Sequence, residues 1–313
     1  MTSVYSYFNT TQIASLDQTT VQYLNTADVQ ALSTTQLVAL ATTALANLNT
    51  TQVGALTTTE LNVITTTQIV GLSSTGLAGL TTAQVPGLST DQLGALNITQ
   101  AGALTSAELR NLTTTQLVQL TTTSVGVLSS DQLGGISTAQ FSALSTTQIT
   151  GLNTTQLGGL ASGQIAALSS DQTLALNTTQ LGGLTSTEVR ALTAATGLVG
   201  LSSTDISVLN TTQLSGLSSA QLGALTTTQF GGLNATDIGG LTATQFGGLS
   251  TTELVQLTVT QVGGLTATQL GGLSTAAVQG LTSTDLGVLN TTQIGGLSKG
   301  QLGAMTTTQV VGL

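Results

Sequence analysis

An eight-residue repeat runs through almost the whole chain, and its clearest copy is Asn177-Thr-Thr-Gln-Leu-Gly-Gly-Leu184. Leu or Ile closes every octad from Leu16 to Leu192 and, after a slip of one residue, nearly every octad from Leu201 to Leu313. A short fixed period predicts a repeat array, in which units contact their neighbours and added units extend the stack. We therefore expect one continuous solenoid over residues 1–313, with an irregular N-terminal cap at 1–24.

Each octad has a consistent order of residue types. Position one is nearly always Ser, Thr or Asn, with Asp17, Ala41 and Ala161 as exceptions. Position four is usually Gln, position five is usually Leu, Ile, Val or Phe, and positions six and seven are mostly Gly or Ala. Ser/Thr-x-x-Gln/Glu is the capping box of a helix N-terminus, and apolar residues before it and at position five form the accompanying hydrophobic staple. The pattern predicts one very short helix per octad, ended by a glycine pair through a left-handed residue.

The acidic residues support this interpretation. They number twelve and lie at positions one, three and four, where a helix start exposes amides that favour a carboxylate. Eight lie at position four: Asp28, Glu60, Glu108, Glu188, Asp205, Asp237, Glu253 and Asp285. Asp91, Asp131 and Asp171 lie at position three and Asp17 at position one. The two arginines, Arg110 and Arg190, lie at position six, toward the C-terminal end that cations prefer.

A β-solenoid is the alternative fold. Thr favours strands, runs such as Thr57-Thr58-Thr59 resemble them, and Pro86-Gly87 would suit a type II turn. Because residues three apart face opposite sides of a strand, the turn would then fall between positions five and eight. We favour an all-α repeat solenoid and keep the β-solenoid as the alternative.

The octads must stack to be stable. Two helical turns are far too short to persist alone in water, so neighbours have to cover each apolar pair. One long helix is also ruled out, because its apolar stripe would rotate from octad to octad. The small residues at positions six and seven permit close approach of backbones. The result is a narrow Leu/Ile/Val spine beneath a Thr/Ser/Gln/Asn surface.

Two segments depart from the repeat. Residues 193–201 form a unit of nine residues that lacks the Gln, and we expect a widened turn or a small kink there. The first units are the least regular and the richest in aromatic residues. Tyr5, Tyr7, Phe8 and Tyr23 are predicted to close the N-terminal end of the spine.

Composition restricts the chemistry. The chain has no Cys and no His, which removes disulfides, imidazole bases and the usual zinc ligands. With three basic residues and a net charge of −9, nucleic acid is an unsuitable partner. No apolar run is long enough for a membrane span, and the N-terminus has no visible secretory signal. We predict no catalytic, cofactor-binding or metal-binding residues and no enzyme activity.

Tandem units such as Leu112-Thr-Thr-Thr-Gln-Leu-Val-Gln-Leu120 resemble those of large Thr/Gly-rich bacterial repeat proteins. That resemblance implies a cell-surface, adhesin-like or filament-forming role. The expected function is a non-enzymatic structural protein, extracellular or at the cell surface, acting as a rigid spacer, surface fibre or filament subunit. Self-association would use open solenoid ends or lateral faces. The alternative is a binding surface on which ranks of Thr recognise a glycan or ice.

Overall fold

The computed structural model describes residues 3–313 and is all-helical. Its short α-helices recur with the octad, and no strand occurs in the described part of the chain. The predicted all-α repeat solenoid is therefore confirmed, and the β-solenoid alternative is wrong. The chain divides into two compact units, Met1–Gly159 and Leu160–Leu313. The prediction of a single continuous solenoid stays a prediction, and Met1 and Thr2 of the expected cap lie outside the described residues.

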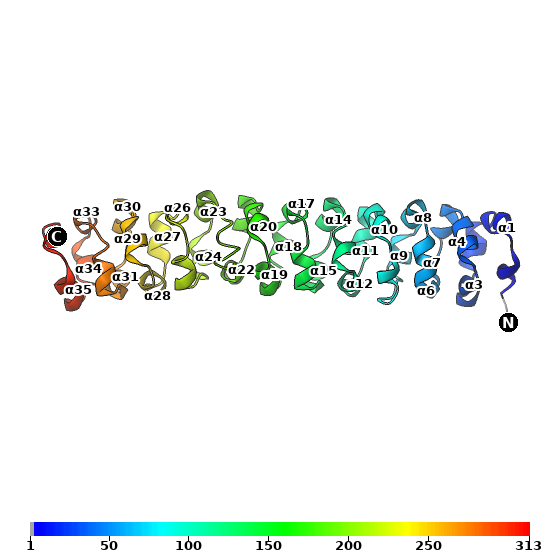
Figure 1. Cartoon of the computed structure of the whole chain (residues 1–313), viewed down its shortest axis with the longest axis horizontal. Helices are drawn as coiled ribbons and strands as arrows, with labels where there is room; N and C mark the ends of the chain where they lie inside the picture. The colour runs from blue at the N-terminus through cyan, green and yellow to red at the C-terminus, as the bar shows by residue number, and fades with distance from the viewer. Residues whose placement is uncertain (1–2) are drawn as a thin grey trace. The chain divides into compact units, whose positions relative to one another are not determined.

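The helices of the first unit follow one another in chain order from blue to green in Figure 1. They are the 3-10 helices η1 (Val4–Tyr7) and η2 (Val85–Gly87), and the α-helices α1 (Thr10–Ala14), α2 (Gln18–Gln22), α3 (Thr26–Gln30), α4 (Thr34–Ala39), α5 (Thr42–Leu45), α6 (Thr50–Ala55), α7 (Thr58–Val63), α8 (Thr66–Gly71), α9 (Ser74–Leu77), α10 (Thr90–Ala95), α11 (Ile98–Ala103), α12 (Ser106–Asn111), α13 (Thr114–Leu117), α14 (Thr122–Gly126), α15 (Ser130–Gly135), α16 (Thr138–Ser142), α17 (Thr146–Thr150) and α18 (Thr154–Leu157).

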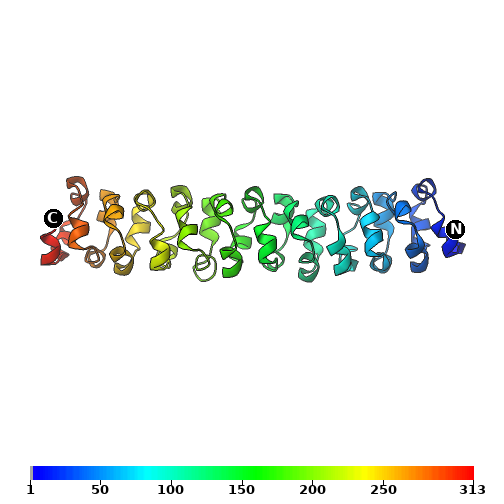
Figure 2. The same ribbon diagram turned by 90° about the horizontal axis from the view of Figure 1, so that it is seen from above.

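The second unit is also a series of short helices in chain order, coloured from green to red in Figure 2. Its helices are α19 (Ser162–Ala166), α20 (Ser170–Leu174), α21 (Thr178–Gly182), α22 (Ser186–Ala191), α23 (Ser203–Ser207), α24 (Thr211–Ser215), α25 (Ser219–Leu222), α26 (Thr227–Phe230), α27 (Ala235–Gly240), α28 (Ala243–Gly247), α29 (Thr251–Val255), α30 (Val259–Gly263), α31 (Ala267–Gly272), α32 (Thr275–Val278), α33 (Ser283–Leu286), α34 (Thr291–Ile294), α35 (Lys299–Ala304) and α36 (Thr307–Val310).

The capping box begins these helices, as the sequence predicts. At α11, the Asn97 side chain accepts a hydrogen bond from the Gln100 N–H at 3.0 Å, and Gln100 Oε1 accepts one from the Asn97 N–H at 3.1 Å. The two bonds satisfy amides that a helix start leaves without intrahelical partners. Ala41 and Ala161 stand at N-caps and provide no side-chain acceptor.

The predicted glycine exit from the helix is wrong. No glycine or other residue in the described chain has a positive φ. The chain instead turns at two consecutive extended residues, the closing residue and the next N-cap. Leu56 has φ −63° and ψ 140°, and Thr57 has φ −78° and ψ 160°. Because this extended pair redirects the chain between helices, a left-handed residue is not needed.

The glycines serve close approach, which the sequence also predicts. A Cβ added to Gly79 would lie 2.4 Å from the Cα and carbonyl oxygen of Thr50, three octads earlier. In the second unit, a Cβ on Gly232 would lie 2.3 Å from the Ser203 carbonyl oxygen. A methyl group cannot fit at these distances, so Gly at position seven lets one octad rest on the helix start of another.

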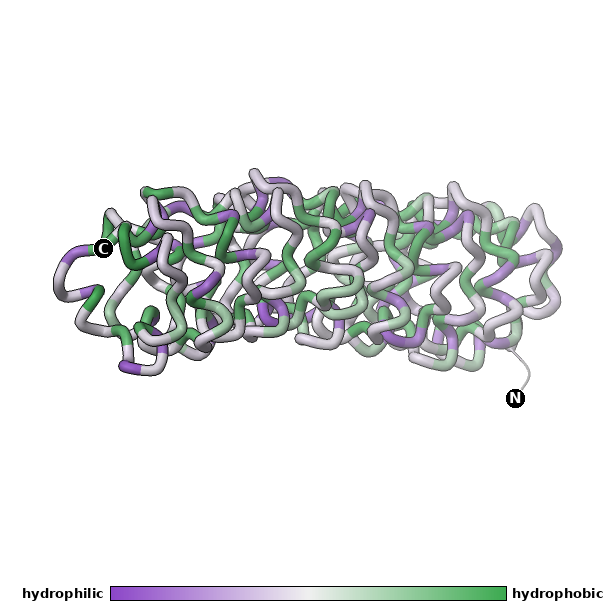
Figure 3. Tube along the Cα trace, turned by 60° about the vertical axis from the view of Figure 1, so that its left-hand side comes forward, coloured by the Kyte–Doolittle hydropathy of each residue, from purple (hydrophilic) through white to green (hydrophobic). Residues whose placement is uncertain are grey.

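Positions five and eight form the core. Leu61 and Ile64 of the first unit are 0% and 2% exposed, and Phe230 and Leu233 of the second unit are equally buried. Figure 3 shows short hydrophobic stretches alternating with hydrophilic ones along the trace of the chain. Within each unit a helix packs on the helix three octads further along, as α12 packs on α15 and α28 on α31. The apolar pair of one octad is thus covered by octads distant in sequence.

The nine-residue slip lies in the second unit and contains no helix. Its backbone closes a wide turn in which the Leu198 N–H donates to the Thr193 carbonyl at 2.8 Å. Val199 within this segment has an exposed apolar side chain, as does Leu174 on α20, three octads earlier. The wide turn takes up the ninth residue, and the helical pattern resumes at α23.

The aromatic residues of the first octads divide into two groups. The rings of Tyr5 and Phe8 pack edge to face with centroids 5.3 Å apart. Tyr7 and Tyr23 are largely exposed, so they do not cover the apolar spine as the sequence suggests. Their place in the octad explains the difference, since both lie at position seven, outside the buried positions five and eight.

Candidate functional site

The position-four glutamine makes a second set of hydrogen bonds that joins distant octads. Its Oε1 completes the capping box, while its Nε2 donates to main-chain carbonyls about four octads earlier. Gln100 Nε2 lies 2.8 Å from the Ile69 oxygen, 3.1 Å from the Val70 oxygen and 2.8 Å from the Leu72 oxygen. We call this set of bonds the glutamine link.

The link recurs in both units with the same spacing. Gln52 binds the carbonyls of Val21 and Leu24, and Gln301 binds those of Leu270 and Leu273, 31 and 28 residues earlier in each case. Most linking glutamines are buried, and Gln100 and Gln301 are each 2% exposed. Buried carbonyls without a donor cost free energy. The link supplies a donor to the carbonyl of the closing residue, such as Leu72, and adds a second donor to the carbonyl of Ile69, which already accepts from the Leu72 N–H at 3.2 Å.

The slip shifts the link by one residue and leaves its geometry intact. Gln213 Nε2 binds the carbonyls of Leu181 and Leu184, 32 and 29 residues earlier, at 2.8 and 2.7 Å. Gln229 returns to the usual spacing, with the Leu198 and Leu201 oxygens both 2.6 Å away. The packing therefore follows the count of octads rather than the count of residues.

The sequence contains a signal for the link that capping alone does not explain. Glu serves the capping box as well as Gln does, yet Gln dominates position four. Only the amide supplies hydrogens to a second set of acceptors. The excess of Gln over Glu therefore indicates a buried partner beyond the helix start.

Departures from Gln concentrate in alternate octads. If residues 1–8 are octad one and the slip is octad twenty-five, the odd-numbered octads from Ser33 onward have Gln at position four except at the slip and at Ala277. The even-numbered octads hold all the other replacements: Ala44, Glu60, Gly76, Glu108, Ser124, Glu188, Asp205, Asp237, Glu253 and Asp285. Since the link spans four octads, odd octads bind odd and even bind even. One series is nearly uniform and the other varies.

The structure uses the acidic side chains in helix caps. Seven of the eight at position four are buried: Glu60, Glu108, Glu188, Asp205, Asp237, Glu253 and Asp285. Glu108 accepts a hydrogen bond from the Thr105 N–H at 2.5 Å, and Asp237 accepts one from the Asn234 N–H at 2.9 Å. Burial raises the pKa of both carboxyls, against the lowering effect of those amides. Hydrogen bonds from Thr20 lower the pKa of the exposed N-cap Asp17.

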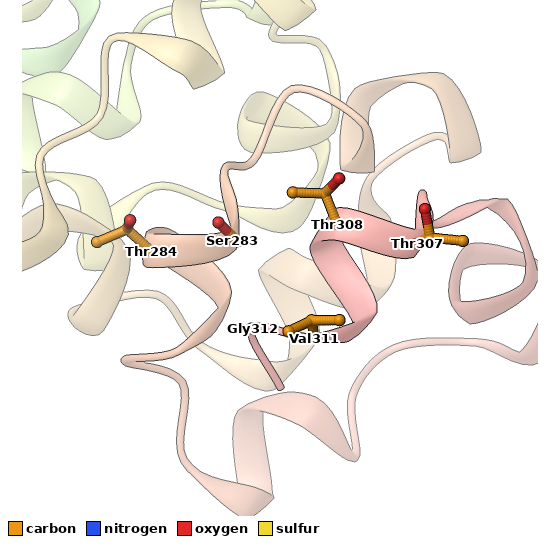
Figure 4. Close-up of a pocket in the computed structure, with 6 residues that line it drawn as sticks. All are labelled: Ser283, Thr284, Thr307, Thr308, Val311 and Gly312. Atoms are coloured by element: carbon orange, nitrogen blue, oxygen red, sulfur yellow. The ribbon is translucent and has the colours of Figure 1, made fainter.

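The surface has shallow hollows between helix starts and the octads packed on them. Figure 4 shows one of about 540 Å³ between α33 and α36, lined by Ser283, Thr284, Thr307, Thr308, Val311 and Gly312. Another, of about 410 Å³, is lined by Thr58, Thr59, Asn62, Val63 and Gly87. Hydroxyl and amide groups beside small apolar surfaces can hydrogen-bond an uncharged polar ligand.

Neither a metal cluster nor a membrane span occurs in the described chain. Among residues 3–313, no three His, Cys, Asp or Glu side chains are grouped so as to hold a metal ion. No described helix has the length and apolar character needed to cross a bilayer. Glu108 and Asp237 each lie within the capping box of their own helix.

Comparison with known proteins identifies the repeat. The model of the ALTTAQ repeat matches residues 21–58, 77–106, 102–138, 133–170, 198–235, 267–299 and 278–313. No curated protein sequence matches the chain. Among solved structures, the chain is similar to the leucine-rich repeat-containing protein LegL7 from Legionella pneumophila. The identity is 12%, with 70% of this chain and 80% of that chain covered, and the TM-score is 0.22. A TM-score this low supports no inference about fold or function.

Proposed function

The chain belongs to the ALTTAQ repeat family, and on that premise we propose that it is a non-catalytic structural protein that acts as a stiff spacer. The observation that carries the proposal is the glutamine link. Each linked octad is tied by buried hydrogen bonds to main chain about four octads earlier, in addition to the apolar contact three octads away. Such ties resist separation of neighbouring turns, which is what a spacer requires.

The use of polar side chains favours structure over catalysis. Position-one side chains cap helices, position-four side chains link octads, and the acids lie within caps. Acids and bases that catalyse reactions are normally gathered in one concave site. We infer that the function belongs to the array and that its reach is set by the number of octads.

We further propose an extracellular or cell-surface location, as a fibre or filament subunit. The support is the resemblance to Thr/Gly-rich bacterial surface repeats, together with a chain that has no Cys and low charge. Labelling of intact, unpermeabilised cells with an antibody to the chain tests the location. Signal at the surface supports it, and signal only after permeabilisation counts against it.

Deletion of whole octads tests the spacer. Removing residues 105–136, which are four octads, keeps the register, so a folded protein should show a smaller maximum dimension in X-ray scattering. Removing residues 113–116, half an octad, should disrupt folding although fewer residues are lost. If the maximum dimension does not change after the 32-residue deletion, the spacer proposal fails.

Self-association through solenoid ends or lateral faces is part of this proposal. Exposed apolar side chains at position six, such as Val38, Val70 and Val255, support a lateral contact. Light scattering over a range of concentrations, with electron microscopy at the highest, tests it. A monomer at every concentration without fibres would exclude the filament and leave the spacer.

A glycan-binding surface is the second candidate, and the hydroxyl-lined hollows favour it. Thr58→Val and Thr59→Val remove hydroxyls while keeping the shape of the hollow near Val63. If glycans bind there, both changes should weaken binding on a glycan array, whereas Thr179→Val on α21 should not. Binding that is unchanged in all three variants argues against this site. The structure does not support the ice-binding alternative, because residues 3–313 contain no strand and so no flat strand ladder of Thr.

A further inference from the structure

Glu108 occupies the place of a linking glutamine. In the octad before it, Gln100 Nε2 lies 2.8 Å from both the Ile69 and Leu72 oxygens. In the octad after it, Gln116 Nε2 lies 2.7 Å from the Leu88 oxygen. The same register directs the Glu108 side chain at the carbonyls of residues 77–80, at the C-terminal end of α9.

The two oxygens of Glu108 have different surroundings. The side chain is 2% exposed, and Oε2 accepts the hydrogen bond from the Thr105 N–H, as Oε1 of a glutamine does. Oε1 of Glu108 therefore takes the position of the amide nitrogen. If the carboxyl were ionised, a charged oxygen would replace the amide donor opposite these carbonyl oxygens, with no hydrogen between them. Burying a charge in that arrangement is strongly unfavourable.

We propose that Glu108 is protonated in the folded chain and donates its O–H to the Leu80 carbonyl. A neutral carboxylic acid has nearly the shape of the glutamine amide, and its single O–H replaces one of the two amide hydrogens. We choose the Leu80 oxygen because no contact is closer than that to the carbonyl 28 residues earlier in the octads on both sides. For Gln100 this contact is 2.8 Å, equal to that with the carbonyl 31 residues earlier, and for Gln116 it is 2.7 Å against 3.4 Å. The link between octads 73–80 and 105–112 then depends on a proton.

The charged neighbours leave this proton in place. Of the elements packed on α12, α15 carries Asp131, while η2 carries no titratable side chain. The helices four octads before and after α12, which are α9 and α16, carry no titratable side chain either. On α12 itself the charged neighbour is Arg110, and both Arg110 and Asp131 are exposed. Burial raises the pKa of the Glu108 carboxyl, in the direction the geometry requires.

A metal cation fits less well than a proton. A cation between Oε1 and the Leu80 oxygen would lie at a coordination distance from each oxygen, roughly 2.3–2.6 Å for Ca²⁺. The two oxygens would then lie further apart than the 2.7–2.8 Å between nitrogen and oxygen in the adjacent links. A shared proton keeps the spacing that the neighbouring octads impose.

The sign of the pH dependence follows from the raised pKa. A carboxyl that binds its proton more tightly when folded contributes stability that is fully present below the pKa of the unfolded chain. That contribution is lost as the pH rises through the folded pKa. The hydrogen bond from Glu108 should therefore be present at acid pH and be lost toward neutral pH. It makes the packing of octads 73–80 and 105–112 in the first unit dependent on pH.

Hydrogen exchange of the full chain at acid and neutral pH, corrected for intrinsic rates, tests the proposal. In the unaltered protein, peptides covering residues 73–80 and 105–112 should lose protection as the pH rises. Glu108→Gln should keep protection at both pH values, because it restores the link found in the adjacent octads. Asp91→Asn, which removes an exposed acid on α10, should keep the behaviour of the unaltered protein.

A direct titration keeps the test independent of any variant's stability. Carboxyl carbon NMR of the unaltered protein, labelled at Glu, should show a resonance that titrates above the usual range of a glutamate and that is lost in Glu108→Gln. An ordinary titration at Glu108, or unchanged pH dependence of protection in Glu108→Gln, would overturn the proposal. Stabilisation by CaCl₂ or KCl that requires Glu108 would assign a cation and would overturn it equally.

Discussion

The octads of α11 and α12 follow one another in the chain and differ in how they are tied to earlier octads. Both begin with a complete capping box, from Asn97 and Gln100 in one and from Thr105 and Glu108 in the other. Gln100 then donates to carbonyls at 2.8 Å, whereas an ionised Glu108 has no hydrogen to donate. The capping box accepts either residue, and the link requires a hydrogen on the second polar atom of the side chain, which the amide always carries. Helix formation and stacking thus depend on different atoms of one side chain.

Transferring the acid to a linking position should have the largest effect. Gln100→Glu keeps the capping box but places a carboxylate against the Ile69 and Leu72 oxygens. We expect a loss of about 3 kcal/mol in the free energy of unfolding at neutral pH, smaller at acid pH where the carboxyl is neutral. Urea denaturation at both pH values measures it.

The matched control is Gln12→Glu, because Gln12 is exposed and its Oε1 accepts the capping bond from the Asn9 N–H. Its free energy of unfolding should change by less than about 0.5 kcal/mol. Equal losses at Gln100 and Gln12 would show that the link contributes nothing beyond the cap.

Removing the cap oxygen should affect the two octads alike. Asn97→Ala and Thr105→Ala each remove the acceptor for the position-four N–H and leave the link untouched. We expect each to lower the free energy of unfolding by about 1 kcal/mol. Thermal denaturation of the two variants checks this, and a loss at Thr105 several times that at Asn97 would mean that capping and linking are not separable.

Supplying a missing link should stabilise the second unit. Ala277 is the exception in the uniform odd series, and the register places it against the carbonyls of Phe246 and Leu249. Ala277→Gln should raise the free energy of unfolding by about 0.5–1 kcal/mol through the new hydrogen bonds. Ala277→Leu, similar in size and without donors, is the comparison in the same denaturation experiment. A larger gain from Leu would assign the effect to packing.

The smallest expected effect is the pH response of the exposed cap Asp17. Hydrogen bonds from Thr20 lower its pKa, so its contribution is present above the unfolded pKa and is lost as the pH falls through the folded pKa. This is opposite in sign to Glu108. Carboxyl NMR titration should place Asp17 below ordinary aspartates. A value at or above them would contradict a capping role.

The features predicted from the sequence are those set by neighbours within one octad. The spacing of Asn97 and Gln100 predicts the cap, and the recurrence of Leu61 and Ile64 at positions five and eight predicts the core. The link escaped prediction because its donors and acceptors lie 28–31 residues apart, with no local pattern to pair them. The predicted glycine exit is wrong because Gly79 is required by its contact with Thr50 rather than by its own backbone angles.

The candidate site could be predicted less well than the fold. The placement of Glu108 and Asp237 in first turns follows from local spacing, and the structure confirms it. Their burial does not follow, since it arises from octads packed above and below. Position four looks solvent-facing on a single short helix, and stacking makes it interior.

The division of the links into odd and even series bears on how such a chain can change length. Inserting or losing an odd number of octads would exchange the two series for all later octads. Octads that vary at position four would then pair with octads of the series that keeps Gln there. Duplication by an even number preserves their identity. Thr105–Leu112 and Thr185–Leu192, which share the pattern of Glu and Arg, are 80 residues or ten octads apart. Glu108 and Glu188 therefore lie in the same series, as expected if the block that contains them was duplicated by an even number of octads.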